Sequence, residues 1–207
     1  MADPVDGITA LLARRTPPGA ADEAAAYSSM IESLRSFLDS LAAARIGTEE
    51  IKELDKSLRG WSDRLAPEAV PVTDWLFGRW TGSPNRGQAL TPDIRILESG
   101  DSHIVAKVRF GEFFMGENGA AHGGAIPLLF DELLGDLSFS GGRAPSRTAY
   151  LKTDFRSTTP VGAELIARGW YEREEGRKRF IHGTLHHGDV LCAEARALFL
   201  ALKPGQP

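Results

Sequence analysis

From about residue 90 onward, apolar residues recur at every second position, and this alternation limits the folds open to the chain more than any other feature. Side chains of a β-strand point alternately to its two faces, so a period of two is typical of strands with one apolar face. Turn signals such as Glu175-Gly176 and Gly188-Asp189 separate the alternating segments. The pattern predicts consecutive antiparallel strands at residues 92–98, 102–110, 147–156, 162–174, 177–187 and 190–202.

One segment in this region, residues 123–138, has a helical period instead. Its wide apolar face consists of Ile126, Leu129, Phe130, Leu133, Leu134 and Leu137. Pro127 falls in the first turn, where its missing N–H costs nothing. A mostly apolar helix between early strands and a later antiparallel run predicts an α+β fold in which a sheet wraps around one central helix. The small side chains of Ala193, Ala195 and Ala197 would let the sheet curve closely against it.

The first third of the chain has a helical pattern. Two apolar stripes recur at spacings of three and four: Tyr27, Met30, Ile31, Leu34, Phe37, Leu38 and Leu41, then Ile51, Leu54, Leu58, Trp61 and Leu65. Gly47 ends the first helix and Thr48 opens the second. The two helices must pack on each other, on the rest of the chain or on a second copy. Stripes this short favour a packed helical hairpin over a coiled coil. We therefore divide the chain into a helical N-terminal arm, residues 1–75, and a strand domain, residues 76–207.

Composition excludes several classes of function. The 207 residues include 24 Lys+Arg and 28 Asp+Glu, a formal net charge of −4, which argues against nucleic-acid binding. No apolar stretch approaches the roughly 18 residues of a membrane span, and the acidic N-terminus does not resemble a signal peptide. The single cysteine, Cys192, excludes an intrachain disulfide and a multi-cysteine metal site. We expect a cytoplasmic protein without membrane insertion.

The residues with the strongest chemical signal precede and enter the predicted central helix. His122-Gly123-Gly124 stands where the helix presents free N–H groups, and the absence of side chains on the glycines would let a ligand oxygen approach the backbone. Asp131 lies nine positions after His122, among apolar neighbours. Apolar surroundings disfavour the charged carboxylate and make it a better general base near neutral pH. Backbone N–H donors for an oxyanion and a carboxylate that acts as a base are together the minimum set of groups needed for acyl transfer to water.

Other interpretations of the same residues are structural. Asp131 could cap a helix or form a salt bridge with an arginine, His122-Gly123-Gly124 could be a plain turn, and Thr148 could simply begin a strand. No G-x-S-x-G motif or P-loop is present. His182 and His186 share a face of a predicted strand, but two ligands without a nearby carboxylate make only a weak case for a metal.

The strings HGGAIPLLFD, SRTAYLKTDFRSTTPVGAEL and HGDVLCAEARALFL resemble the hotdog-fold acyl-CoA thioesterases of the phenylacetate-pathway type. The resemblance covers roughly residues 90–203 and is most specific over residues 119–131. It implies hydrolysis of acyl-CoA to a carboxylic acid and CoA without a metal or other cofactor. It also implies a homodimer, or a dimer of dimers, with sites built across the subunit interface.

The resemblance further implies roles for individual residues. Asp131 would be the general base or the nucleophile, and the Gly123 N–H, with Gly124, would polarise the thioester carbonyl. His122 would brace the loop, and Thr148 would help to position the water. Basic residues at the rim of the site would bind the CoA phosphates. The candidates, chosen by their place in the sequence, are Lys152, Arg156, Arg177 and Arg179.

One position departs from the family pattern. Many members carry an asparagine six residues before the histidine, where this chain has Gly116. Asn118 lies nearby and is a candidate to bind substrate in its place, but it is two positions away from the asparagine of the pattern. This departure favours an alternative in which the domain binds acyl-CoA without hydrolysing it, as a sensor or accessory subunit. A hydratase or dehydratase on the same fold is a weaker alternative, because its Asp, Asn-Pro and His pattern is not found.

Overall fold

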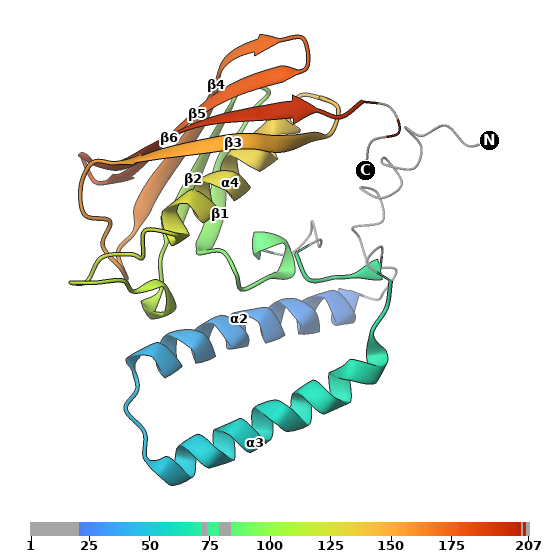
Figure 1. Cartoon of the computed structure of the whole chain (residues 1–207), viewed down its shortest axis with the longest axis vertical. Helices are drawn as coiled ribbons and strands as arrows, with labels where there is room; N and C mark the ends of the chain where they lie inside the picture. Colours follow the sequence, from blue (N-terminus) through green and yellow to red (C-terminus); the bar gives the residue numbers. More distant parts are fainter. Residues whose placement is uncertain (1–20, 72–73, 79–83, 204, 206–207) are drawn as a thin grey trace.

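The computed structural model describes residues 21–71, 74–78, 84–203 and 205. Its strands form one antiparallel sheet in the order β1-β2-β4-β5-β6-β3 (Figure 1). Their bounds are β1 Asp93–Ser99, β2 His103–Arg109, β3 Ser146–Phe155, β4 Leu165–Glu175, β5 Lys178–His187 and β6 Val190–Ala201. Each strand predicted from the alternation is confirmed, with ends within three residues of those expected. Gly176 and Gly188 close the last two hairpins at φ values of 58° and 57°, which a glycine adopts without strain.

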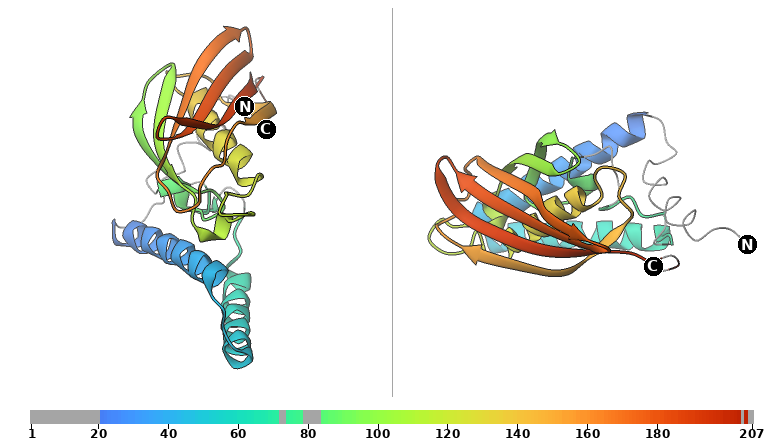
Figure 2. Two further views of the ribbon diagram at one scale, coloured as in Figure 1. Left: turned by 90° about the vertical axis from the view of Figure 1, so that its left-hand side faces the viewer. Right: turned by 90° about the horizontal axis from the view of Figure 1, so that it is seen from above.

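The sheet curves around helix α4 (Ala125–Ser138), as Figure 2 shows. The apolar face of α4 is buried against the inner face of the sheet, where Ala193, Ala195 and Ala197 provide the small side chains that the sequence predicted. Gly183 on β5 lies so close to α4 that an added Cβ would be 3.0 Å from Phe130 Cδ1. Burying each Leu or Phe of this helix contributes about 1.5–3 kcal/mol. This arrangement confirms the predicted α+β hotdog fold.

The helical arm differs from the prediction. Helices α2 (Ala21–Ala43) and α3 (Thr48–Leu65) form where expected, and Gly47 is the N-cap residue of α3. The expectation of a packed hairpin is wrong, because α2 packs on the strand domain and α3 projects away from it (Figure 2). Ile31 of α2 is buried. Arg35 donates hydrogen bonds to the carbonyl oxygens of Gln88 and Thr91 at 2.6 and 2.8 Å, which holds α2 to the strand domain.

Two short 3₁₀ helices connect the arm to the site region. The first, η3 (Pro84–Gly87), precedes β1, and the Tyr27 hydroxyl of α2 donates to its Gly87 carbonyl at 3.4 Å. The second, η4 (Glu112–Phe114), lies against α2, where Asp39 Oδ1 accepts a hydrogen bond from the Phe113 N–H at 3.0 Å. A third, η1 (Ala66–Glu68), continues α3. The helical arm therefore contacts the loops on both sides of the first hairpin.

Candidate active site

Asp131 and Thr148 are brought together by the packing of β3 against α4. Asp131 lies in the second turn of α4, and the Thr148 hydroxyl donates a hydrogen bond to Asp131 Oδ1 at 2.8 Å. Thr148 pairs with the buried Phe199 of β6, so its side chain points to the helix side of the sheet. Ala149 is then a bulge residue, since Thr148 and Tyr150 pair with successive residues of β6. The carboxylate therefore has a fixed partner on the edge strand.

The surroundings of Asp131 are not those expected from its apolar neighbours in sequence. Leu129, Phe130 and Leu133 point into the core, whereas Asp131 is exposed on the flank of α4. This correction follows from helical geometry: residues adjacent in sequence are about 100° apart around the axis. In the single chain, solvent rather than apolar side chains contacts the carboxylate.

A cleft of about 370 Å³ opens beside Asp131 and Thr148. It is lined mostly by charged and small residues of α4 and β3, and its apolar lining comes from Phe139 and Phe199. Arg86 of η3 forms a hydrogen-bonded ion pair with Glu132 at the edge of the cleft, and Gln88 Nε2 lies 3.5 Å from the same carboxylate. The sequence analysis missed Arg86 and Glu132, because a contact between residues 46 positions apart has no local signal.

The His122-Gly123-Gly124 turn lies immediately before α4 and is exposed. Hydrogen bonds fix its shape: the His122 N–H donates to the Phe114 carbonyl at 2.7 Å, and the Ala125 N–H donates to the His122 carbonyl at 2.9 Å. The Gly124 N–H donates to His122 Nδ1 at 3.0 Å and is therefore already engaged. The Gly123 N–H has no hydrogen-bond partner among the residues that the structure describes. Gly123 is thus the backbone donor open to a ligand.

Within one chain, the Gly123 turn and the Asp131 carboxylate are far apart. Ala125 begins α4, and Asp131 follows six residues later, which corresponds to about 9 Å along the axis and about 240° around it. A single thioester carbonyl cannot contact both groups of the same chain. The predicted residues therefore lie in two separate groups, the candidate half-sites: Asp131 with Thr148, and His122 with Gly123.

Gly116 stands where the family pattern has an asparagine, and the backbone there is crowded. A Cβ on Gly116 would lie 3.1 Å from His122 Cα and 3.3 Å from the Ala120 carbonyl oxygen. The Gly116 N–H also donates to that carbonyl at 2.8 Å. A larger residue would require the turn before His122 to shift. Asn118 lies at the exposed tip of this turn with a φ of 55°.

Two of the predicted phosphate ligands, Lys152 and Arg156, lie at the exposed edge of β3 with acidic partners. Lys152 Nζ is 3.1 Å from Asp154 Oδ2, and Arg156 forms an ion pair with Glu194. The hydrogen bond from Arg156 holds the pKa of Glu194 below its usual range. The exposed ion pairs contribute little stability and leave both cations accessible to a phosphate.

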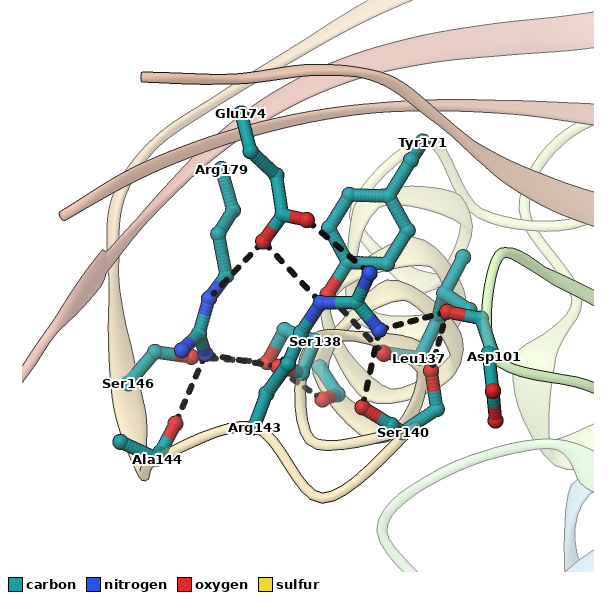
Figure 3. A network of polar contacts seen from close by, with 11 residues as sticks. Asp101, Leu137, Ser138, Ser140, Arg143, Ala144, Ser146, Tyr171, Glu174 and Arg179 are labelled. Atoms are coloured by element: carbon teal, nitrogen blue, oxygen red, sulfur yellow. Dashed lines mark hydrogen bonds and ion pairs between the residues drawn. The ribbon is translucent and has the colours of Figure 1, made fainter. Parts of the chain in front are cut away.

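Arg177 and Arg179 lie at the other end of the sheet. Arg177 Nε donates to the Ala201 carbonyl at 2.7 Å. Arg179 is buried, and its Nη1 donates to the carbonyls of Ser138 and Ala144 at 2.7 and 2.8 Å, as Figure 3 shows. Its Nε lies 3.6 Å from Glu174. With its guanidinium occupied by the protein, Arg179 is not a rim cation, and the expectation that it binds phosphate is corrected to a structural role.

Two further properties bear on the class of site. Among the described residues, no group of three or more His, Cys, Asp or Glu side chains is arranged to hold a metal ion. Within that same part of the chain, no helix has the length and apolarity needed to cross a membrane.

Comparison with known proteins first defines the fold. The crystal structure of the thioesterase superfamily protein RHA08564 matches this chain with a TM-score of 0.72 at 24% identity, over 89% of this chain and 93% of the other. A match of that extent includes helices of the N-terminal arm as well as the sheet. Protein smu.793 from Streptococcus mutans UA159, solved bound to acetyl CoA, matches with a TM-score of 0.51 at 17% identity over 55% of this chain.

Sequence comparison then matches part of the chain to a known family. Residues 118–194 match the model of the thioesterase superfamily. Acyl-coenzyme A thioesterase THEM4 of Rattus norvegicus is 32% identical over 109 residues, which are 52% of this chain and 46% of the rat protein. The Mus musculus protein of the same name is 31% identical over 109 residues. The matched stretch therefore spans less than half the length of these relatives.

Proposed function

We propose that this protein hydrolyses acyl-CoA thioesters to a carboxylic acid and CoA. The observation that carries the proposal is the Asp131 carboxylate, held by Thr148 at 2.8 Å beside a cleft, in a domain whose turn before α4 leaves the Gly123 N–H open. The names of the rat and mouse relatives and the acetyl CoA bound to smu.793 support this substrate class.

The reaction joins one water to the thioester carbonyl and breaks the C–S bond. Asp131 Oδ1 accepts the hydrogen bond from Thr148, so Oδ2 would be the oxygen that reacts with the water or the thioester. As a general base, Asp131 takes a proton from the water while the Gly123 N–H stabilises the oxyanion, and the departing CoA thiolate takes up the proton. As a nucleophile, Asp131 would first form an anhydride with the acyl group, which water then hydrolyses. Label found in the Asp131 side chain after a single turnover in ¹⁸O-labelled water would show the second route, in which water attacks the Asp131 carboxyl carbon of the anhydride, because the first route never places label there.

The complete site would contain two copies of the chain. Because Gly123 and Asp131 of one chain cannot reach one carbonyl, the Gly123 half-site of a second copy would face Asp131 and Thr148 of the first. Strand β3 forms one edge of the sheet, and its unpaired backbone groups offer a surface for such association. Exposed Tyr150 and Phe155 lie on the same strand. We accordingly propose a homodimer or dimer of dimers in the cytoplasm, needing no metal or other cofactor.

The test is thiol release from short, long and aromatic acyl-CoAs by the wild type and by Asp131→Asn. We expect turnover to fall by about two orders of magnitude or more in the variant. Asp136→Asn is a matched control, because Asp136 lines the same cleft on the same helix, and its turnover should remain within a few-fold of wild type. If the wild type binds acyl-CoA but releases no thiol, the non-catalytic acyl-CoA-binding alternative replaces the proposal.

A further inference from the structure

Helix α3 carries an apolar stripe that is largely exposed, although the Arg64 guanidinium lies over the Trp61 ring at 4.1 Å. Ile51, Leu58, Trp61 and Leu65 are between 49% and 63% exposed, and α3 has no buried residue. Together with the half-buried Leu54, these residues are spaced three, four, three and four apart. That spacing repeats every seven residues and forms one narrow seam along the helix. It is the pattern of a helix that pairs with one other helix rather than with a broad core.

The stability of α3 itself requires such a partner. In proteins most of the stability of a helix comes from packing its amphipathic face rather than from helix propensity, and α3 has an amphipathic face but no buried residue. Helix α2 does not fill this role, since it packs on the strand domain and α3 projects away from it (Figures 1 and 2). The partner must present a complementary apolar seam of similar length, about 27 Å.

The charges beside the seam specify the partner. Acidic residues outnumber basic ones in the first half of α3, which has Glu49, Glu50, Glu53 and Asp55 but only Lys52 and Lys56. Basic residues outnumber acidic ones in the second half, which has Arg59 and Arg64 but only Asp63. An antiparallel pair of identical helices therefore places each acidic half against a basic half. A parallel pair would place like halves together, which is unfavourable.

The seam is also nearly symmetric about Leu58. In an antiparallel pair centred there, Leu58 meets its own copy, and Ile51 lies opposite Leu65 near each end. Glu50 and Arg64 flank the seam on the same side, which places Glu50 of one helix near Arg64 of the other in two equivalent pairs. Such an arrangement has the self-complementarity of a two-fold interface.

We propose that α3 is a self-association helix, which pairs in antiparallel fashion with α3 of a second copy of this chain through the seam centred on Leu58. This contact is separate from the β3 edge. It does not depend on whether the protein hydrolyses acyl-CoA.

The test is disulfide cross-linking in the full-length chain. Ser57→Cys places a thiol beside the two-fold centre, whereas Lys56→Cys places one on the opposite face of α3 as the matched control. The only native cysteine, Cys192, is fully buried and should not react. We expect mild oxidation to convert Ser57→Cys, but not Lys56→Cys, to a covalent dimer. Equal cross-linking at both positions, or none at position 57, would overturn the proposal.

Charge reversal tests the identity and direction of the partner. In the Ser57→Cys background, Glu50→Lys should lower the initial cross-linking rate roughly threefold or more, because it introduces two repulsive pairs. Adding Arg64→Glu to the same chain should restore the rate, since each helix then complements its copy again. Loss without restoration would mean that α3 contacts a different surface and would overturn the antiparallel pairing. Circular dichroism confirms that each variant is folded.

Discussion

The Thr148 hydroxyl donates a hydrogen bond to Asp131 Oδ1 at 2.8 Å, joining the edge strand β3 to the flank of α4. The two residues are 17 positions apart, and the bond depends on how closely the strand packs against the helix. It engages one carboxylate oxygen of a residue that also lines the cleft. The orientation of Asp131 is therefore set by a residue on another element, which can be tested separately from the carboxylate itself.

Removing the hydroxyl of Thr148 should lower turnover without removing the carboxylate. Thr148→Val has nearly the same shape but no donor, and we expect kcat for the best acyl-CoA to fall about tenfold, the equivalent of one hydrogen bond of about 1.4 kcal/mol. The loss should appear mainly in kcat rather than in KM, because the hydroxyl acts by orienting Asp131. Thr148→Ser retains the donor and should keep most of the activity. Equal losses in both variants would contradict an orienting role.

The guanidinium of Arg179 should be needed for stability. Arg179→Met removes the Arg179 donor from the Ala144 carbonyl and leaves the Ser138 carbonyl with the longer hydrogen bond from the Tyr171 hydroxyl, at 3.3 Å. Because Arg179 is buried, we expect the free energy of unfolding to fall by about 2–4 kcal/mol. Arg177→Met, in the same hairpin but exposed, should cost about 1 kcal/mol or less. Urea unfolding measures both. Weaker CoA binding by the Arg179 variant at unchanged stability would return this residue to the phosphate-binding candidates.

The same network predicts a dependence of stability on pH. The hydrogen bonds from Arg143 hold the pKa of Glu174 below its usual range (Figure 3). A carboxyl with a lowered pKa in the folded state stabilises the protein above its unfolded pKa of about 4.3, and this stabilisation is lost as the pH falls further. Glu174→Gln should therefore lose less stability than wild type between pH 7 and pH values below about 4.

Unfolding at both pH values measures this difference, and Glu172→Gln provides a control on the same strand. Glu172 is exposed and should respond as the wild type does. A Glu174 variant with the same acid sensitivity as wild type would show that the bonds from Arg143 contribute nothing to folding.

The close contact between β5 and α4 should tolerate no added methyl group. A Cβ on Gly183 would lie 3.0 Å from Phe130 Cδ1 and 3.1 Å from Leu134 Cδ2, so Gly183→Ala should lower the free energy of unfolding by about 1–3 kcal/mol. Gly60→Ala is the matched control, because a Cβ there meets nothing within 4 Å. In a helix interior the control change should be neutral or slightly stabilising. Thermal melts should give a lower Tm for Gly183→Ala and an unchanged or slightly higher Tm for Gly60→Ala.

Much of the fold could be predicted because each strand and helix has its own pattern of apolar residues in the sequence. Period-two alternation located all six strands, and the apolar face of residues 126–137 located the buried helix. These signals depend only on which neighbouring residues face the same side. The helices of the arm were found in the same way, but their packing was predicted wrongly. A stripe shows that a helix needs a partner without showing which one.

The sequence alone determined the element types and the family resemblance, and it singled out the candidate site residues around Asp131 and Gly123. Only the tertiary structure decided that β3 forms the edge beside β6, that Thr148 bonds Asp131, and that Arg86 reaches Glu132. It also showed that Asp131 is exposed and Arg179 buried, the reverse of what their neighbours in sequence indicated. The physical reason is common to all of these. Burial and long-range contacts depend on how faces pack in three dimensions, and local periodicity does not specify that packing.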